Sequence, residues 1–452
     1  MSEATETRTA GEAGWHVSRY NLWAPLPDSS YVAIVNLFKG SCAAYTPLEL
    51  YLLNVLEELD EHHPIIDRFA RRGIIARFDE RAVLESMGRA SCALPHGIAL
   101  TICPTMGCNF DCPYCFEDHF AGKMSAQVQD DVVALAERMM EASGAKDLSV
   151  SWFGGEPLLA TDVIETLSAR LMALSEARGG SYSASIITNG YLLTQEVVDL
   201  LDAAKVKTAQ ITIDGLGPTH DATRRLAGGG PSFERITSNL RNNRIPFRVS
   251  IRHNVHEGNK HEADALETYV ERLAEESGND LSYYPAPVSG SAAADERGEQ
   301  VALLCGSDAS EVGIRQEAQR FRVGRGHYCG AHSIWCVGID EKGNLHKCWE
   351  AVDKPALSFG TAHDWDPKDP IATASNPDKL TTFLNTAIPV PDEECRECVW
   401  LPHCVGGCPY RRLQGQRACV AYKDDPEQFV HALHARIAEQ KKEREEQEQK
   451  AE

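Results

Sequence analysis

The sequence predicts an α/β protein, with a winged-helix-like module at its start, a partial (β/α)6 barrel in its centre and a cysteine-rich domain towards its end. The barrel is predicted because apolar, strand-like runs alternate with amphipathic helices between residues 96 and 286. The module is predicted from the order strand, helix, helix, strand within residues 15–95. The third part, residues 328–425, holds eight of the 15 cysteines.

Length and charge exclude several classes of protein. The 452 residues can bury a large core, and their 45 basic and 66 acidic side chains give a formal charge of −21. That acidic excess argues against a nucleic-acid partner. No apolar run approaches the roughly 20 residues of a membrane span, and residues 1–14 lack the apolar core of a signal peptide. We expect a cytoplasmic protein without membrane contact, whose cysteines are metal ligands or thiols before disulfides.

The N-terminal region begins with residues 1–14, which are small and polar and which we predict to be disordered. Residues 31–38 are apolar and β-branched and predict a strand, onto which residues 42–45 can pair back. A helix should follow, because Thr46 can cap it and Glu49 can complete a capping box. We predict this helix over residues 48–59, with one apolar face made of Leu48, Leu52, Val55, Leu56 and Leu59.

The remainder of the module contains a second helix over residues 64–72, which Gly73 should end. A short strand over residues 74–78 follows, and Asp79 can cap a last helix that reaches Met87. This order fits a winged-helix-like module, and a purely structural cap on the barrel is the alternative.

The barrel is predicted from six apolar runs and the helices between them. The runs cover residues 98–103, 148–152, 183–187, 208–213, 247–252 and 281–284. The helices are predicted near residues 126–143, 163–177, 195–203, 232–243 and 260–276. Six such units, two fewer than a complete barrel has, predict a partial barrel, and function in parallel barrels gathers where strands run into their following loops.

The loop after the first run contains Cys108, Cys112 and Cys115, in the spacing C-x3-C-x2-C. Three soft thiolates on one short loop can hold three irons of a cubane iron–sulfur cluster. Without a fourth protein thiolate nearby, one iron stays open to another ligand, as in catalytic metal sites. A zinc knuckle or three reduced structural thiols are the alternatives.

Polar residues also follow the later strands. The second run ends in Gly154 and Gly155, whose backbone can approach a ligand closely, and in Glu156, whose carboxylate can bind an ammonium group. The candidate residues after the third, fourth and fifth runs are Thr188, Asn189, Asp214, Arg252 and Asn254. Each alone is a common turn residue, but their joint position at successive strand ends indicates a site.

Residues 287–327 are predicted to connect the barrel to the third domain, with a helix near residues 314–321. Four isolated cysteines are interpreted as small buried apolar groups: Cys42, Cys92, Cys103 and Cys305. The last segment, residues 426–452, predicts a helix with an apolar face (Phe429, Leu433, Ile437) and a solvated charged tail.

The cysteine loop resembles the radical S-adenosylmethionine (SAM) superfamily, including Tyr114 before its last cysteine and Phe116-Glu117 after it. The resemblance implies that Cys108, Cys112 and Cys115 bind a 4Fe–4S cluster whose open iron SAM chelates. It also implies cleavage of SAM to a 5′-deoxyadenosyl radical that abstracts a hydrogen atom from the substrate. By the same resemblance, a further set of residues contacts SAM: Phe116, Gly154, Gly155, Glu156, Thr188, Asn189, Asp214 and Arg252.

The eight C-terminal cysteines suffice for two four-ligand clusters or for zinc sites. Their order resembles the SPASM domain, a C-terminal extension of radical SAM enzymes with two auxiliary 4Fe–4S clusters. The resemblance implies one cluster on Cys329, Cys348 and Cys408, with Cys336 as the candidate fourth ligand. It implies the other on Cys395, Cys398, Cys404 and Cys419. We favour ligation by Cys336; without it, an open iron could bind a substrate thiolate.

The N-terminal module resembles the peptide-recognition modules of enzymes that modify ribosomally made peptides, and residues 18–21 resemble the start of many such maturases. The resemblance therefore implies a maturase that binds the leader of a precursor peptide and crosslinks its core, with flavodoxin or ferredoxin as electron donor. Thioether formation from cysteine is the first choice of product, and a carbon–carbon or carbon–oxygen crosslink is the alternative.

Two other functions are weighed against this one. An anaerobic sulfatase maturase would form formylglycine, and that family has an Asp base directly after the cysteine equivalent to Cys348. Here Trp349 follows and Glu350 lies one residue late. A non-catalytic iron–sulfur or zinc scaffold would leave the strand-end motifs without a role. No general base is evident: Glu117, Asp118 and Glu350 are the carboxylates near the predicted clusters.

Overall fold

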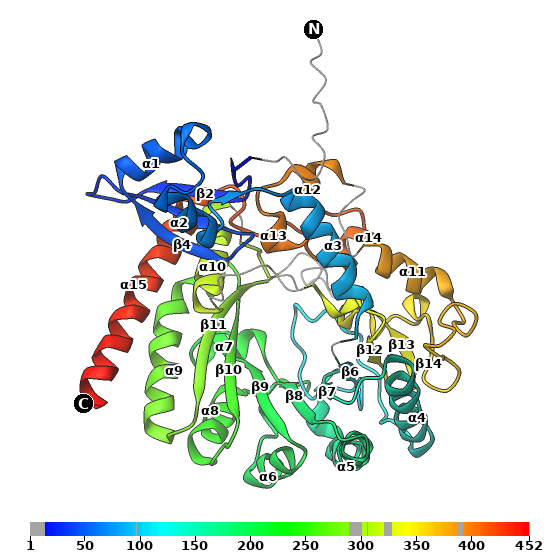
Figure 1. Ribbon diagram of the computed structural model, residues 1–452. Coiled ribbons are helices and arrows are strands. Elements are labelled where there is room, and N and C mark those ends of the chain that lie inside the picture. The colour runs from blue at the N-terminus through cyan, green and yellow to red at the C-terminus, as the bar shows by residue number, and fades with distance from the viewer. Residues whose placement is uncertain are drawn as a thin grey trace.

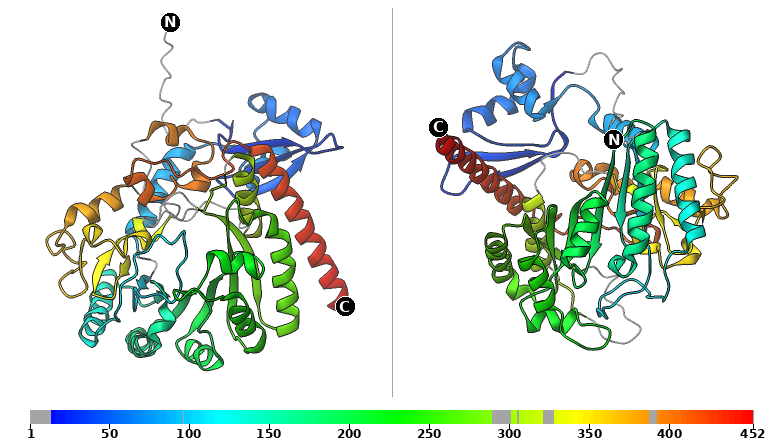
Figure 2. Two further views of the ribbon diagram at one scale, coloured as in Figure 1. Left: turned by 180° about the vertical axis from the view of Figure 1, so that it is seen from behind. Right: turned by 90° about the horizontal axis from the view of Figure 1, so that it is seen from below.

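The computed structural model describes residues 14–95, 97–288, 301–304, 306–320, 328–386 and 392–451 (Figure 1). An arched sheet with helices on its outer side forms the centre of the molecule, and the N- and C-terminal segments lie together at one end of it (Figures 1 and 2). Residues 1–13, which we predict to be disordered, lie outside the described residues. Cys305 and part of the connector lie outside them too. No helix in the described part of the chain is long and apolar enough to span a membrane.

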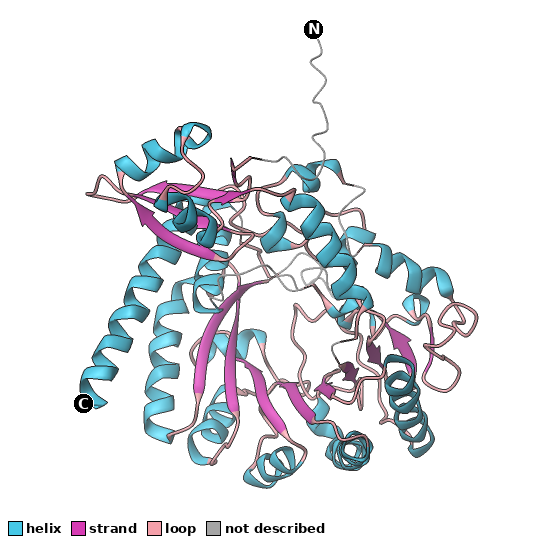
Figure 3. Ribbon diagram, viewed as in Figure 1, coloured by secondary structure: helices cyan, strands magenta, loops and turns pink. Residues whose placement is uncertain are grey.

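Six parallel strands in chain order form the main part of the central sheet (Figure 3). These are β6 (Ile98–Ile102), β7 (Leu148–Trp152), β8 (Tyr182–Thr188), β9 (Val206–Thr212), β10 (Arg248–Val255) and β11 (Leu281–Pro287). The helices between them are α4 (Ala126–Ser143), α5 (Thr161–Ala177), α6 (Gln195–Ala203), α7 (Pro218–Thr223), α8 (Phe233–Asn242) and α9 (Ala263–Ser277). The predicted alternation is confirmed, with two short additions, α7 and a 3-10 helix at Pro157–Ala160.

The sheet continues beyond the barrel into the C-terminal segment, which the sequence did not predict. Strand β12 (Cys336–Ile339) pairs in parallel with β6, so that Cys336 lies opposite Ala99. Strands β13 (Asn344–His346) and β14 (Gly360–Thr361) then extend the sheet antiparallel. The cysteine-rich segment is therefore attached to the first barrel strand, beside the loop that carries Cys108.

The N-terminal unit contains a three-stranded antiparallel sheet of β2 (Asn21–Pro25), β3 (Val32–Asn36) and β4 (Ser41–Tyr45). Helix α1 (Pro47–Asn54) begins with the predicted capping box of Thr46 and Glu49. Its predicted length is wrong, and its predicted face is right only in part, because Leu56 is buried and Leu52, Val55 and Leu59 are half-buried. The helix ends at Asn54, Leu48 is 67% exposed, and Leu53 and Leu56 are the buried leucines. The first turn of α1 contains no buried residue, so the buried residues of this segment begin at Leu53 instead of at Leu48.

The rest of the N-terminal unit leads towards the cysteine-rich segment. Helix α2 (Pro64–Arg72) ends at Gly73 as predicted, and β5 (Ile75–Ala76) pairs with β1 (His16–Val17). Helix α3 (Glu80–Ala93) is longer than predicted, and the carbonyl of its last residue accepts a hydrogen bond of 2.9 Å from the Trp335 indole. The winged-helix-like assignment stays a prediction.

The N-terminal unit and the C-terminal helix lie side by side in Figure 2, and an apolar cluster joins them. Tyr20 and Leu22 of the N-terminal unit pack with Trp400 and with Phe429 of α15 (Pro426–Ala451). Helix α10 (Gly306–Arg320) contributes Ile314 to the same cluster. The predicted C-terminal helix is confirmed, and its apolar face is what holds it to the N-terminal sheet.

Candidate functional site

A cavity of about 630 Å³ lies against the inner side of the central sheet, and seven of the predicted ligand cysteines line it. These are Cys108, Cys112, Cys115, Cys329, Cys336, Cys348 and Cys408. The first three come from the loop between β6 and α4, and the other four come from the C-terminal segment. Folding therefore brings the predicted first set and one predicted auxiliary set to the walls of one cavity.

The loop of the first three cysteines is held by backbone contacts. Phe110 forms a bridge with Leu226, and the amide of Cys115 donates to the carbonyl of Cys112 at 3.1 Å. The amide of Phe110 donates to the sulfur of Cys108 at 3.4 Å. Burial raises the pKa of the Cys108 thiol to about 12. Cations such as irons would offset this penalty on the thiolates, so the soft, buried donor set fits an iron–sulfur cluster.

Gly154 and Gly155 allow close packing of two loops, and their expected approach to a ligand stays a prediction. A Cβ atom on Gly155 would lie 2.4 Å from the carbonyl oxygen of Gly107, and one on Gly154 would lie 2.4 Å from that of Thr105. The amide of Glu156 also donates to the carbonyl of Gly107 at 2.8 Å. Both glycines line the cavity, and their lack of side chains lets this turn pack directly on the cysteine loop.

The carboxylate of Glu156 is buried and accepts three hydrogen bonds. The Thr188 hydroxyl donates to it at 2.7 Å, the Asn189 amide at 2.7 Å and the Leu158 amide at 2.9 Å. Thr188 and Asn189 line the cavity, whereas Glu156 lies behind them. Glu156 therefore joins the ends of β7 and β8, and its predicted contact with an ammonium group stays a prediction.

Asp214 belongs to a buried network that sequence reasoning found only in part. The Tyr114 hydroxyl donates to its carboxylate, and Arg224 donates to that hydroxyl at 3.0 Å. The backbone N–H of Asn254 donates to the Asp214 carboxylate at 2.9 Å, and the side-chain Nδ2 of Asn254 donates to the Tyr114 hydroxyl at 3.3 Å. Burial raises the pKa of Asp214, while Arg224 and Tyr114 oppose that rise.

Arg224 is the functional candidate that the sequence did not reveal. It is 8% exposed, lines the cavity, lies over the Phe110 ring at 5.6 Å, and its Nε has no hydrogen-bond partner in the described structure. Its neighbour in the sequence is another arginine, so the pair looks like an ordinary charged surface turn. A buried cation with a free donor beside the cysteine loop can bind an anionic group. Such a group is present in SAM as its carboxylate.

Arg252 lies at the end of β10, lines the cavity, and donates through Nε to the side chain of Asn254 at 2.7 Å.

The cavity also has an aromatic strip. The rings of Phe116 and Phe153 stack at 6.5 Å, and Phe153 contacts Trp349 at 5.4 Å. This strip runs from the first cysteine loop to the segment that carries Cys348. The predicted SAM-contact residues thus surround the cavity, with Glu156 and Asp214 supporting it from behind.

Two carboxyl groups lie beside this strip in different environments. Asp353 pairs with Lys354 Nζ, which is 2.8 Å from both carboxylate oxygens, and it also accepts the Asp118 amide at 3.1 Å. Glu117 lines the cavity, and its Oε1 is buried without a hydrogen-bond partner in the described part of the chain. Burial, together with the charge of Asp353, raises the pKa of Glu117 to about 8.

The predicted auxiliary set at this cavity surrounds a buried lysine. Lys347 is 5% exposed and donates to the backbone carbonyls of Ser333 and Cys336. Burial lowers the pKa of Lys347 to about 8, although the neighbouring Cys336 and Cys329 oppose the shift. Lys347 thereby ties the start of β12 to the segment just before Cys348.

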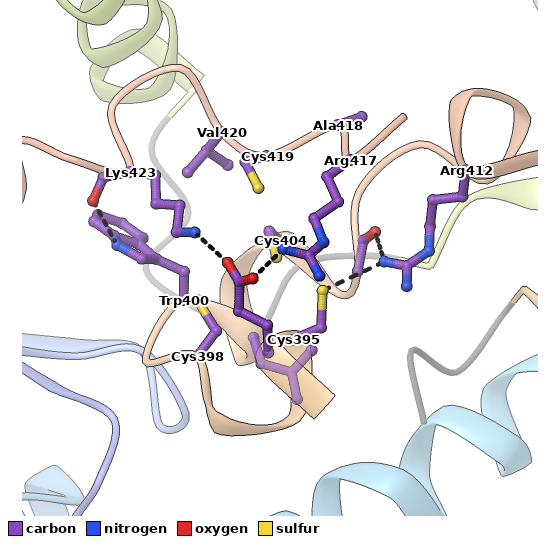
Figure 4. Close-up of a pocket in the computed structure, with 13 residues that line it drawn as sticks. Cys395, Cys398, Trp400, Cys404, Arg412, Arg417, Ala418, Cys419, Val420 and Lys423 are labelled. Carbon is purple, nitrogen blue, oxygen red and sulfur yellow. Dashed lines mark hydrogen bonds and ion pairs between the residues drawn. The ribbon is translucent and has the colours of Figure 1, made fainter. Parts of the chain in front are cut away.

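The second predicted auxiliary set occupies a separate pocket (Figure 4). Cys395, Cys398, Cys404 and Cys419 all line it. Arg412 donates to the sulfur of Cys395 at 3.5 Å (Figure 4), and Arg417 and Lys423 pair with Glu394, which also lines the pocket. Four thiols with cationic neighbours fit a negatively charged thiolate cluster. Among the described residues, no three His, Cys, Asp or Glu side chains gather closely enough to hold a single metal ion.

Comparison with known proteins bears on the barrel. Residues 102–268 match the model of the Radical SAM superfamily. The PqqA peptide cyclase of Xanthomonas axonopodis pv. citri (strain 306) is 25% identical over 325 residues, which are 68% of this chain and 79% of that protein. Sporulation killing factor maturation protein SkfB of Bacillus subtilis (strain 168) is 26% identical over 178 residues, 39% of this chain and 40% of SkfB.

A solved structure shares the fold. Native anSMEcpe with bound AdoMet and Cp18Cys peptide superposes with a TM-score of 0.56 at 20% identity, over 76% of this chain and 98% of that one. At this identity the likeness concerns the fold alone. It extends past the family match at residues 102–268, so the shared fold is larger than the matched domain.

Proposed function

We propose that this enzyme, which cleaves SAM and carries a radical SAM domain at residues 102–268, modifies a ribosomally made precursor peptide. The observation that carries the proposal is the single cavity lined by both Cys108, Cys112 and Cys115 and the four cysteines around β12. The similarity to the PqqA peptide cyclase, over 79% of that protein, supports a peptide as the substrate. The N-terminal module, residues 15–95, would bind the leader, and the enzyme would work in the cytoplasm with flavodoxin or ferredoxin.

In this proposal, Cys108, Cys112 and Cys115 hold the 4Fe–4S cluster. When bound, the cluster and SAM supply a 5′-deoxyadenosyl radical that abstracts a hydrogen atom from the peptide. The chain's own residues position the reactants. Arg224 and Arg252 offer cationic donors on the cavity wall, and Glu156 holds Thr188 and Asn189 in place.

Crosslinks are the proposed product, most simply thioethers from cysteine, with carbon–carbon or carbon–oxygen bonds as the alternative. Closing each ring removes two hydrogens from the peptide: one as the abstracted atom, the other as a proton and an electron. The eight C-terminal cysteines would hold the two auxiliary clusters that accept this electron, with Cys336 as a full ligand. Cys336 starts β12 and lines the cavity beside Cys329, which supports that choice.

Formylglycine formation is the second candidate. Trp349, which lines the cavity after Cys348, cannot accept a proton, and this disfavours the base position of a sulfatase maturase. Mass spectrometry separates the candidates: a candidate precursor is treated anaerobically with reconstituted enzyme, SAM and reductant. Loss of two hydrogens with cysteines blocked to alkylation supports thioethers. The same loss with free cysteines indicates carbon–carbon or carbon–oxygen bonds, and a cysteine converted to an aldehyde indicates formylglycine.

The proposed cluster assignment has its own test in cysteine variants. Alanine at Cys108, Cys112 or Cys115 should abolish formation of 5′-deoxyadenosine, because the ligands of the first cluster are lost. Alanine at Cys395 or Cys398 should reduce crosslinked product more than 5′-deoxyadenosine. Persistent 5′-deoxyadenosine in the first group of variants would refute the assignment.

A further inference from the structure

The cavity wall between the two cysteine sets carries a half-exposed aromatic ring. Trp349 is 45% exposed although it lines the cavity and contacts Phe153 at 5.4 Å. Phe153 is buried and stacks in turn on Phe116, next to the first cysteine loop. The indole therefore has support on one side and an accessible surface inside the cavity. Large apolar surface left exposed in a concave site is typical of ligand contact.

A hydrogen-bond acceptor without a partner lies on the same wall. Glu117 follows Phe116 directly, and its Oε1 is buried and unpaired within the described residues, while the neighbouring Asp353 is paired with Lys354. The amide of Asp118 donates to Asp353, which ties this loop to the segment after Trp349. Buried acceptors are seldom left unpaired, because desolvation without a hydrogen bond costs free energy. Oε1 is thus placed to receive a donor from a ligand.

The charges around these two residues favour a cationic ligand. Glu350 also lines the cavity next to Trp349. The nearby Lys347 directs its ammonium group to the carbonyls of Ser333 and Cys336, and Lys354 pairs with Asp353. The wall near Trp349 therefore presents the carboxyl group of Glu117 and an indole face to the cavity. An indole face attracts cations, and carboxyl groups bind guanidinium and ammonium donors strongly.

We propose that Trp349 and Glu117 form a subsite for a basic side chain, arginine or lysine, of the peptide substrate. Its charged end lies over the indole and donates a hydrogen bond to Glu117 Oε1. The inference rests on the proposed function, because it assumes that a peptide enters this cavity. It adds that the peptide carries a basic residue next to the position that reacts.

Binding of short probes to the reconstituted full-length protein with SAM tests this subsite. The probes are acetyl-Gly-Arg-Gly-amide, acetyl-Gly-Lys-Gly-amide, acetyl-Gly-Leu-Gly-amide and acetyl-Gly-Glu-Gly-amide, and titration calorimetry measures each dissociation constant. We expect the two basic probes to bind about tenfold more tightly than the leucine probe, and the acidic probe to bind most weakly. Trp349→Ala and Glu117→Gln should each weaken the basic probes about fivefold.

Ile371→Ala is the control, because Ile371 is 48% exposed, lies outside the N-terminal module and does not line the cavity. It should bind all probes like the parent protein. Trp349→Phe keeps an aromatic face and should lose less affinity than Trp349→Ala, which guards against a variant that simply misfolds. Equal binding of the leucine and basic probes, or unchanged binding in Trp349→Ala, would overturn the subsite.

The two proposals fail in different ways. If the subsite is wrong but the function is right, the probes show no basic preference while a precursor peptide is still crosslinked. If the function is wrong, basic probes can still bind through Trp349 while no peptide product forms with any precursor.

Discussion

Buried charge in the barrel is concentrated at Asp214 and Arg224, which the Tyr114 hydroxyl connects. The hydroxyl gives its proton to the carboxylate and accepts donors from Arg224 and Asn254. The Tyr114 hydroxyl oxygen, on the cysteine loop, therefore bonds to Asp214 after β9 and to Asn254 in β10. Networks of this kind are rigid when complete and costly when one member is removed.

Tyr114→Phe should lower the free energy of unfolding by about 2–3 kcal/mol, because Asp214 and Arg224 both lose a partner inside the protein. Asp214→Asn should cost more, about 3–5 kcal/mol, because it leaves the buried guanidinium without its counter-charge. Urea unfolding of the apo protein measures both. The matched control is Tyr182→Phe, since the half-buried Tyr182 makes one long hydrogen bond, 3.3 Å, to Ser168. A Tyr114→Phe variant no less stable than this control would contradict the network's importance.

The buried side chain of His253 should make the free energy of unfolding depend on pH. It is fully buried beside the Tyr283 hydroxyl at 3.0 Å, and burial lowers its pKa to about 3. The unfolded chain, with a pKa near 6.5, binds the proton more readily, so stability is lost as pH falls from about 6.5 towards 3. His253→Gln should reduce the slope of unfolding free energy between pH 4 and 6 by up to about 1.4 kcal/mol per pH unit.

His363 provides the contrast for that measurement. It is exposed and lies 3.1 Å from Asp131, which raises its pKa. Its contribution is therefore complete at low pH and is lost as pH rises above the unfolded value, outside the window of His253. His363→Gln should leave the slope between pH 4 and 6 unchanged. Equal slopes in His253→Gln and the parent protein would show that His253 is protonated in the native state.

At the level of the elements, the loops after β6 and β7 pack backbone against backbone. The cysteine loop presents the carbonyls of Thr105, Met106 and Gly107 to Gly154 and Gly155. This contact sets the distance between the cysteine loop and the strand end that carries Glu156. The cavity beside Cys108 therefore depends on two residues that have no side chain.

Gly155→Ala should disturb this contact, because its Cβ would lie 2.4 Å from the Gly107 oxygen and 2.6 Å from that of Met106. Overpacking of this kind costs about 1–3 kcal/mol, and here it displaces the cysteine loop. We expect a lower melting temperature and less iron retained after reconstitution. Gly228→Ala is the control, since nothing lies within 4 Å of a Cβ at Gly228. Normal iron content in Gly155→Ala would show that the loops can separate without loss of the site.

At the scale of the whole molecule, the N-terminal unit contacts the cysteine-rich segment, from which it is distant in the sequence. Glu397, between Cys395 and Cys398, lies 2.5 Å from Arg19 and 2.7 Å from Arg81 of the N-terminal unit. Trp400 packs against the same unit in the apolar cluster. The N-terminal unit and the segment that carries the second predicted auxiliary set are therefore in direct contact.

Iron content tests the organisation of the whole chain. Three four-iron clusters predict about twelve irons per chain after reconstitution. The double variant Cys395→Ala and Cys398→Ala should lose about four, since its cysteines line only the separate pocket, and should keep 5′-deoxyadenosine formation. Cys42→Ala, in β4 and outside both pockets, should keep all the iron. A double variant that lost all its iron would show that the sets are interdependent.

The order of the barrel and the grouping of the cysteines could be predicted from the sequence. Strand and helix periodicity is a local property, and β7, α4 and α6 begin and end at the predicted residues. The resemblance of the cysteine order to the SPASM domain indicated which cysteines to expect together, and each of the two predicted auxiliary sets lines a pocket. Both features depend on residues that are close in sequence or on motifs with strong chemical constraints.

Other features were decided only by the tertiary structure. The pairing of β12 with β6 joins segments remote in sequence, and four residues are too short to predict such a pairing. Arg224 looks like a surface residue until the fold encloses it, and the buried face of α1 depends on where the rest of the unit packs. Burial and long-range pairing are properties of the assembled chain, because each requires surfaces that no single segment contains. The sequence by itself therefore determined which chemical groups to expect, and the tertiary structure decided which of them line one cavity and which line a separate pocket.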